Sequence, residues 1–107
     1  MGSYQRGDVV LVPVRIRESG EQKVRPAVVV KADEGGDLVV CPVSQKPAFD
    51  TPSIPIGLPD FAEGGLDLFS ESFVLTSHPC RVKATVVRGK KGRLREEVVE
   101  ELDCRRS

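Results

Sequence analysis

Three valine-rich runs of strand length constrain the fold of this chain more than any other feature of its sequence. They read DVVLVPV at residues 8–14, PAVVVKA at residues 26–32 and DLVVCPV at residues 37–43. β-Branched side chains favour extended backbone, and short apolar runs bounded by turn residues are typical of buried strands. Gly35 and Gly36 lie between the last two runs. Because glycine tolerates the positive φ of a tight turn, we expect these two strands to form a hairpin.

The rest of the chain is predicted to hold only short strands before a final helix. Prolines at positions 47, 52, 55 and 59 exclude a long helix and permit short edge strands such as SIPI at residues 53–56. Two further strands are predicted at SFVLTS, residues 72–77, and at VKATVV, residues 82–87. The second of these is expected to run into a basic turn, RGKKGR, at residues 88–93.

A C-terminal helix is predicted over residues 95–106. Val98, Val99 and Leu102 form one apolar stripe, with glutamates in the first turn and arginines in the last. No good N-cap residue precedes the helix, so we expect its start to fray. These elements predict a mainly β (α+β) fold, a small curled antiparallel sheet or barrel with a C-terminal α-helix, in a single domain over residues 1–107.

The charge of the chain is balanced, with 16 basic and 16 acidic residues. A balanced chain lacks the global field of a strongly basic nucleic-acid-binding domain, so any anion site must be local. Residues 81–95 carry seven basic side chains and no acidic ones. This segment is either a surface that attracts phosphate or a solvated hairpin tip.

Cysteine usage and hydropathy favour a soluble, cytoplasmic protein. The three cysteines form no C-x-x-C pair, which is typical of reduced thiols. No run approaches the roughly 18 apolar residues of a membrane span, so we predict no membrane contact. Motifs for nucleotide or metal binding are absent from the sequence, and we predict no cofactor and no metal.

Arg25, Ser44 and His78 are the candidate catalytic residues. Pro26 restrains the backbone before the second valine-rich run, so a stiff element positions the Arg25 guanidinium, whose planar fork matches phosphate oxygens. The alternative is an ion pair between Arg25 and Glu18 or Glu21. Ser44 directly follows the third run, and an antiparallel hairpin places it at the same end of the sheet as Arg25. His78 is either a general acid or base or a loop residue before proline.

Several stretches of the chain resemble the MazF/PemK family of bacterial toxin endoribonucleases. YQRGDVVLV, SGEQKVRPAVVV, LVVCPVSQ, SFVLTSHPCRV and GRLREEVVEEL occur in the order and spacing of that family. The likeness spans nearly the whole chain and is most specific in RGDVV and GEQKVRPAVVV. It implies a small SH3-like or CcdB-like β-barrel, a homodimer, and a cognate antitoxin that neutralises the toxin.

The resemblance also implies a reaction. In that family the 2′-hydroxyl of single-stranded RNA is the nucleophile of a metal-free cleavage, which leaves a 2′,3′-cyclic phosphate and a 5′-hydroxyl. Arg25 matches the family's R-P arginine and would stabilise or protonate the phosphate, while Ser44 stands where the family usually has a threonine. The residues predicted to bind RNA are Glu21, Gln22, Lys23, Ser77 and Arg81.

The sequence departs from the family pattern at two places. Gly20 replaces a histidine that some members use, and residues 77–81 replace a pair of acidic or amide side chains. Proton transfer then falls to His78, or Arg25 and Ser44 suffice with water, which is our hypothesis, or activity is weak. The alternative function is a catalytically weakened SH3-like module that binds an antitoxin or nucleic acid without cleavage. A gyrase-poisoning toxin is the least favoured, since Arg25 has no evident use there.

Overall fold

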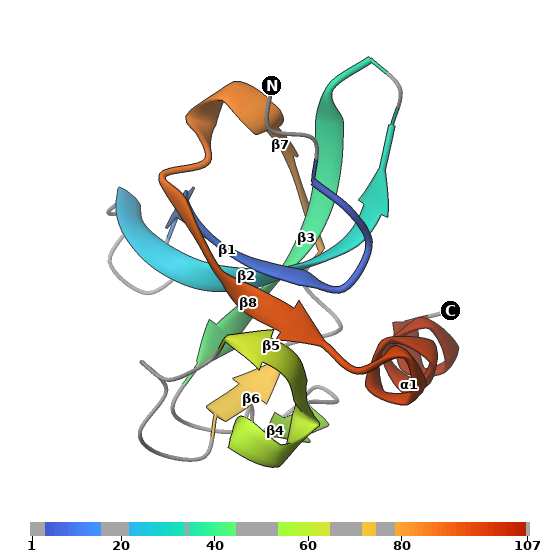
Figure 1. Ribbon diagram of the computed structural model, residues 1–107. Helices are drawn as coiled ribbons and strands as arrows, with labels where there is room; N and C mark the ends of the chain where they lie inside the picture. The colour runs from blue at the N-terminus through green and yellow to red at the C-terminus, as the bar shows by residue number, and fades with distance from the viewer. Residues whose placement is uncertain are drawn as a thin grey trace.

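The computed structural model describes residues 4–15, 22–33, 35–44, 54–64, 72–74 and 79–106, and these form eight strands and one α-helix (Figure 1). The predicted mainly β fold with a C-terminal helix is confirmed. The elements are β1 (Asp8–Arg15), β2 (Gln22–Ala32), β3 (Asp37–Ser44), β4 (Ile54–Ile56), β5 (Phe61–Gly64), β6 (Ser72–Val74), β7 (Cys80–Lys83), β8 (Gly89–Leu94) and α1 (Glu96–Arg106), with 3-10 turns η1 (Leu58–Asp60) and η2 (Ala84–Val86).

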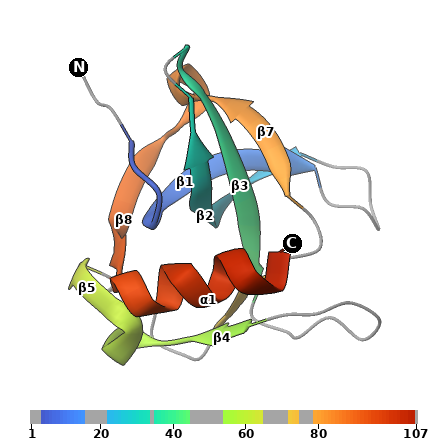
Figure 2. The ribbon, with the colours of Figure 1, turned by 90° about the vertical axis from the view of Figure 1, so that its right-hand side faces the viewer.

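The strands form one antiparallel sheet in the order β4-β6-β3-β2-β1-β8-β5, and β7 pairs with β3. The ladder between β1 and β2 is long, running from Val9 opposite Val28 to Arg15 opposite Gln22. The sheet curls into a half-barrel, because β4 and β5, the two ends of the strand order, lie at the same side of the molecule (Figures 1 and 2).

The predicted hairpin between β2 and β3 is confirmed, with Ala32 opposite Leu38 beside its turn. Gly36 adopts a φ of +92°, and the nitrogen of Gly36 donates to the carbonyl of Asp33 at 3.2 Å. A Cβ atom on either Gly35 or Gly36 would meet no atom within 4 Å. Backbone conformation alone therefore requires glycine at this turn, and only at position 36.

Substituting these two glycines separately tests that requirement. We expect Gly36→Ala to lower the free energy of unfolding by about 1–2 kcal/mol, since an L-residue is strained at positive φ. Gly35→Ala is the matched control and should change stability by less than about 0.5 kcal/mol. Urea unfolding followed by circular dichroism measures both, and equal effects of the two substitutions would contradict the argument.

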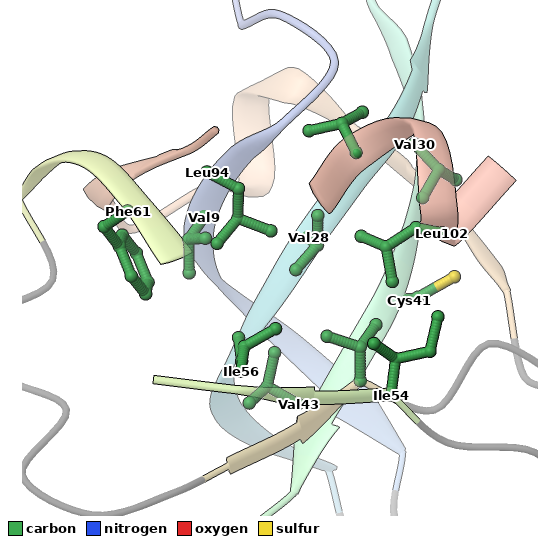
Figure 3. Packing of buried hydrophobic residues seen from close by; sticks show 12 residues of the cluster. Val9, Val28, Val30, Cys41, Val43, Ile54, Ile56, Phe61, Leu94 and Leu102 are labelled. Carbon is green, nitrogen blue, oxygen red and sulfur yellow. The ribbon is translucent and has the colours of Figure 1, made fainter. Parts of the chain in front are cut away.

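A hydrophobic core fills the space between the sheet and α1, which lies across one side of the sheet (Figure 2). Leu102, fully buried, lies beside Val28, Val30 and Cys41 (Figure 3). We call this side of the sheet the helix side. Its buried residues are Val9, Val28, Val30, Cys41, Val43, Ile54, Ile56, Phe61, Val74, Leu94, Val99 and Leu102.

The central strands also bury their other side, which explains why the valine runs are continuous rather than alternating. Val82 of β7, Ala84 of η2 and Val87 pack there, so we call it the η2 side. The central residues of β1, β2 and β3 are therefore buried on both sides of the sheet. The buried residues of the η2 side are Val10, Val12, Ala27, Val29, Leu38 and Val40.

Two predictions for the second half of the chain were wrong. The basic segment predicted as a turn is strand β8, which pairs with β1 and β5. Its lysines and arginines lie at exposed or half-buried positions, while Gly92 and Leu94 are buried, so its charge is compatible with a strand. The strand predicted at residues 82–87 is wrong in part, because β7 ends at Lys83 and the next three residues form η2. In β5, Gly64 at a φ of +73° lies opposite Gly92. A Cβ atom on Gly64 would fall 2.5 Å from the carbonyl oxygen of Lys91.

The start of α1 is held by tertiary hydrogen bonds rather than by a capping side chain. The carbonyl of Arg95 accepts from the nitrogens of Val98 and Val99 at 3.0 and 3.1 Å. Arg95 itself donates from its backbone nitrogen to the carbonyl of Asp60 and from Nε to the carbonyl of Pro59, both at 2.8 Å. No described helix has the length and apolarity needed to cross a bilayer.

Candidate functional site

Arg25 lies in β2 opposite Val12 of β1, on the η2 side of the sheet. Side chains two residues apart in a strand project to the same side of the sheet. Ala27 and Val29 belong to the η2-side cluster, so Arg25 also projects to the η2 side. The side chain of Arg25 is half-buried. Its Nε atom is buried and has no hydrogen-bond partner among the described residues.

Two prolines limit the pairing of β2 with β3 next to Arg25. The ladder ends where Ala27 faces Pro42, and Pro26 is the next residue outward on β2. Because proline has no N–H to donate, it is tolerated in a sheet only where the neighbouring strand is lost. Beyond this point β2 stays paired with β1, whereas β3 pairs with β6. Arg25 therefore lies where two neighbouring strands part.

Ser44 ends β3 at the same opening. It lies two residues beyond Pro42, as Arg25 lies two residues beyond Ala27 on the partner strand. Alternation with Val40, a member of the η2-side cluster, places Ser44 on the same side of the sheet as Arg25. Ser44 is half-buried. The strand register thus brings both residues to one side and one end of the sheet.

A row of side chains crosses the η2 side through these two residues. Ser44 pairs with Phe73 of β6, and Phe73 pairs with Pro55 of β4. Directly opposite residues of antiparallel strands project to the same side, so these side chains are neighbours. We call this set the cross-strand row; it consists of Pro55, Phe73 and Ser44 on one flank of the point where β2 and β3 part, and of Arg25 and Val12 on the other.

Most other candidates from the sequence lie outside the described residues. These are His78, Ser77 and Glu21, together with Glu18, the alternative partner of Arg25. Gln22 and Lys23 belong to β2, where they are paired with Arg15 and Val14 of β1. Their roles in catalysis or RNA binding stay predictions.

Arg81 is not brought together with Arg25 and Ser44. Arg81 pairs with Val39 of β3, which packs on the helix-side cluster, so its side chain projects to the opposite side of the sheet. Its Nη1 atom lies 3.7 Å from Oδ2 of Asp37, and the side chain is 64% exposed. The sequence could not reveal this because the side depends on how β7 registers with β3.

Asp8 is a buried carboxylate that the sequence interpretation did not single out. Its side chain is 1% exposed, and Oδ1 lies 3.1 Å from Nε of Arg93 and 3.4 Å from Nζ of Lys90. Oδ2 accepts from the backbone nitrogen of Gln5 at 2.9 Å. The preceding Gly7 has a φ of +99° and donates to the carbonyl of Val29 at 2.7 Å. The RGDVV stretch is therefore a structural junction between β1 and β8.

Several side chains of the basic segment at residues 81–95 have local partners. Arg81 contacts Asp37, Lys90 and Arg93 share Asp8, and the Arg95 side chain donates to a carbonyl. The two carboxylates offset part of the charge of the seven basic residues. Among the residues that the structure describes, no three His, Cys, Asp or Glu side chains gather as metal ligands.

The fold and the site together define a small half-barrel protein with a cationic cross-strand row at the point where two strands part. The chain belongs to the PemK-like, MazF-like toxins of type II toxin–antitoxin systems, because the sequence profile of that family matches residues 5–105. A search among curated protein sequences gives no significant match.

Two solved structures share this fold. The Mycobacterium tuberculosis toxin MazF-mt6 superposes with a TM-score of 0.64 at 12% identity, covering 92% of this chain and 90% of that chain. The MazE-MazF crystal structure from Deinococcus radiodurans superposes with a TM-score of 0.64 at 18% identity, covering 96% of this chain and 92% of that chain. At such low identities the likeness is one of fold.

Proposed function

We propose that this chain is an endoribonuclease toxin that cleaves single-stranded RNA without a metal ion. Family membership supports the toxin role. The observation that carries the activity is the placement of Arg25 and Ser44 on one side and at one end of the sheet, where β2 and β3 part. Both side chains are only half-buried, and the guanidinium fork of Arg25 matches phosphate oxygens.

The proposed reaction needs little chemistry from the protein. The ribose 2′-oxygen attacks the adjacent phosphorus, forming the P–O2′ bond while the P–O5′ bond breaks. The products are a 2′,3′-cyclic phosphate and a 5′-hydroxyl. Arg25, as a permanent cation, stabilises the charge that develops on the non-bridging oxygens, and the Ser44 hydroxyl donates to the same phosphate. The proton of the 2′-hydroxyl passes to water or His78, and the leaving 5′-oxygen gains a proton from water or from the protonated His78.

Partners and location follow from the family. We propose that an antitoxin protein neutralises this chain, in line with the MazE-MazF pair of the structurally similar protein. The RNA target places the protein in the cytoplasm, and kinship favours a homodimer.

The alternative function, binding without cleavage, has one observation in its favour. The cross-strand row contains neither a carboxylate nor an imidazole, so it offers no general base. A toxin that relies on water for proton transfer would cleave slowly, and one that has lost the activity would only bind. One experiment separates these outcomes.

We expect the purified protein to cut a long transcript of mixed sequence in the presence of excess EDTA. The new 5′ ends should accept phosphate from polynucleotide kinase without prior phosphatase treatment, and mass spectrometry should find 2′,3′-cyclic phosphates. The same sequence with 2′-O-methyl riboses should stay intact, because it lacks the nucleophile. Binding without cleavage would establish the alternative, and cleavage that requires Mg²⁺ would contradict the mechanism.

A further inference from the structure

Phe73 occupies the position next to Ser44 in the cross-strand row. Val74, its neighbour along β6, is fully buried in the helix-side cluster, so Phe73 projects to the η2 side. Its direct partners are Ser44 on one flank and Pro55 on the other, and the Pro55 side chain is exposed. An aromatic ring therefore lies beside the proposed phosphate-binding residues.

The ring of Phe73 lies outside the two core clusters of the described residues. Phe61 is 5% exposed within the helix-side core, as expected for a phenyl group that serves packing. Phe73 is only half-buried and belongs to neither core cluster of the described residues. Tyr4, the other described aromatic residue, packs against the η2-side cluster. Phe73 is thus a half-buried aromatic side chain beside Ser44 in the candidate site.

We propose that Phe73 is a stacking platform for the base of a nucleotide adjacent to the phosphate held by Arg25 and Ser44. This inference rests on the proposed function, because it needs single-stranded RNA in the site. Neighbouring strands lie about 4.8 Å apart, so the backbone of Phe73 lies one strand spacing from that of Ser44. Stacking on an aromatic face suits single strands, because every base presents a π-face. Phe73 would bind the base and leave cleavage chemistry to the arginine and serine.

A fluorescence experiment tests the contact directly. The chain contains no tryptophan, so Phe73→Trp introduces a single tryptophan into the full-length protein. The probes are 2′-O-methyl dodecamers of A, C and U, which cannot be cleaved. Stacking should quench the emission of the Phe73→Trp variant on titration. Val86→Trp is the matched control, because Val86 is 38% exposed in η2, at the opposite end of the molecule from β6 (Figure 1).

Absence of quenching in the Phe73→Trp variant, whether or not the dodecamer binds, would overturn the assignment. So would equal quenching in the Val86→Trp variant, because it would indicate binding unrelated to the cross-strand row. These outcomes do not depend on cleavage. If the unmodified protein cuts no RNA yet the Phe73→Trp emission is quenched, the proposed activity fails and the stacking contact stands.

Kinetics then separate stacking from packing. We expect Phe73→Ala to raise KM for a cleavable RNA about ten-fold with little change in kcat, because stacking contributes equally to substrate and transition state. Phe73→Leu keeps an apolar side chain without a π-face and should show most of the same loss. If Phe73→Leu behaves like the unmodified protein, the ring serves packing alone and the proposal is wrong. Should Phe73→Ala fail to fold, Phe73→Leu and Phe73→Trp decide the matter.

Discussion

Replacing Arg25 with alanine should lower the rate of RNA cleavage by about 10²–10³-fold, the usual effect of removing one donor that stabilises transition-state charge. The loss should fall mainly on kcat, because the charge on the phosphate grows as the P–O2′ bond forms. Thermal stability should change little, since Nε of Arg25 makes no hydrogen bond to any described residue. Single-turnover cleavage in EDTA, measured beside a melting curve, checks both expectations.

Two further variants make that experiment specific. Arg25→Lys retains the charge but loses the planar fork, so its rate should lie between those of Arg25→Ala and the unmodified protein. Lys83→Ala removes an exposed cation from β7, whose alternation places Lys83 on the helix side, and it should cleave normally. Full activity of Arg25→Ala would remove Arg25 from the mechanism. An equal loss in Lys83→Ala would indicate a general charge effect.

The placement of Arg25 and Ser44 shows what the sequence could predict about the site. The hairpin turn predicts that Arg25 and Ser44 lie at one end of the sheet. Their common side depends on a register shift between Val29 and Lys31, which the sequence does not reveal. What the sequence could not predict is that the strands part just before these residues. That depends on the transfer of β3 to β6, a strand far along the chain. Phe73 could not be placed in the cross-strand row from the sequence for the same reason, because its position follows from the pairing of β3 with β6.

The fold was predictable where local composition and backbone preference agree. The valine runs and the hairpin turn are of this kind. Strand β8 was missed because lysine, arginine and glycine disfavour strands locally, while its backbone partners β1 and β5 are distant in the sequence. Its basic side chains nonetheless meet a buried acceptor, Asp8, in β1. The sequence suggested that the basic segment at residues 81–95 is a solvated turn or a surface that attracts phosphate. Part of it instead makes a structural contact with β1.

Asp8→Ala should lower the free energy of unfolding by about 3 kcal/mol, one of the largest effects of any single substitution in this chain. The carboxylate is 1% exposed and joins Lys90, Arg93 and the backbone of Gln5, so its loss removes one buried acceptor shared by all three. The estimate is at the low end for buried ion pairs, because Lys90 and Arg93 are more than a third exposed and can turn to water. Urea unfolding measures the change.

Asp37→Ala is the matched control for that measurement. Asp37 is also a strand aspartate paired with an arginine, but its side chain is 37% exposed and its distance to Arg81 is 3.7 Å. An exposed ion pair contributes about 0–1 kcal/mol, so this variant should unfold close to the unmodified protein. Cleavage per folded molecule should be unchanged in both, since neither aspartate belongs to the cross-strand row. Equal stability of the two variants would mean that the Asp8 junction is replaceable, and reduced cleavage by folded Asp8→Ala would assign Asp8 a second role.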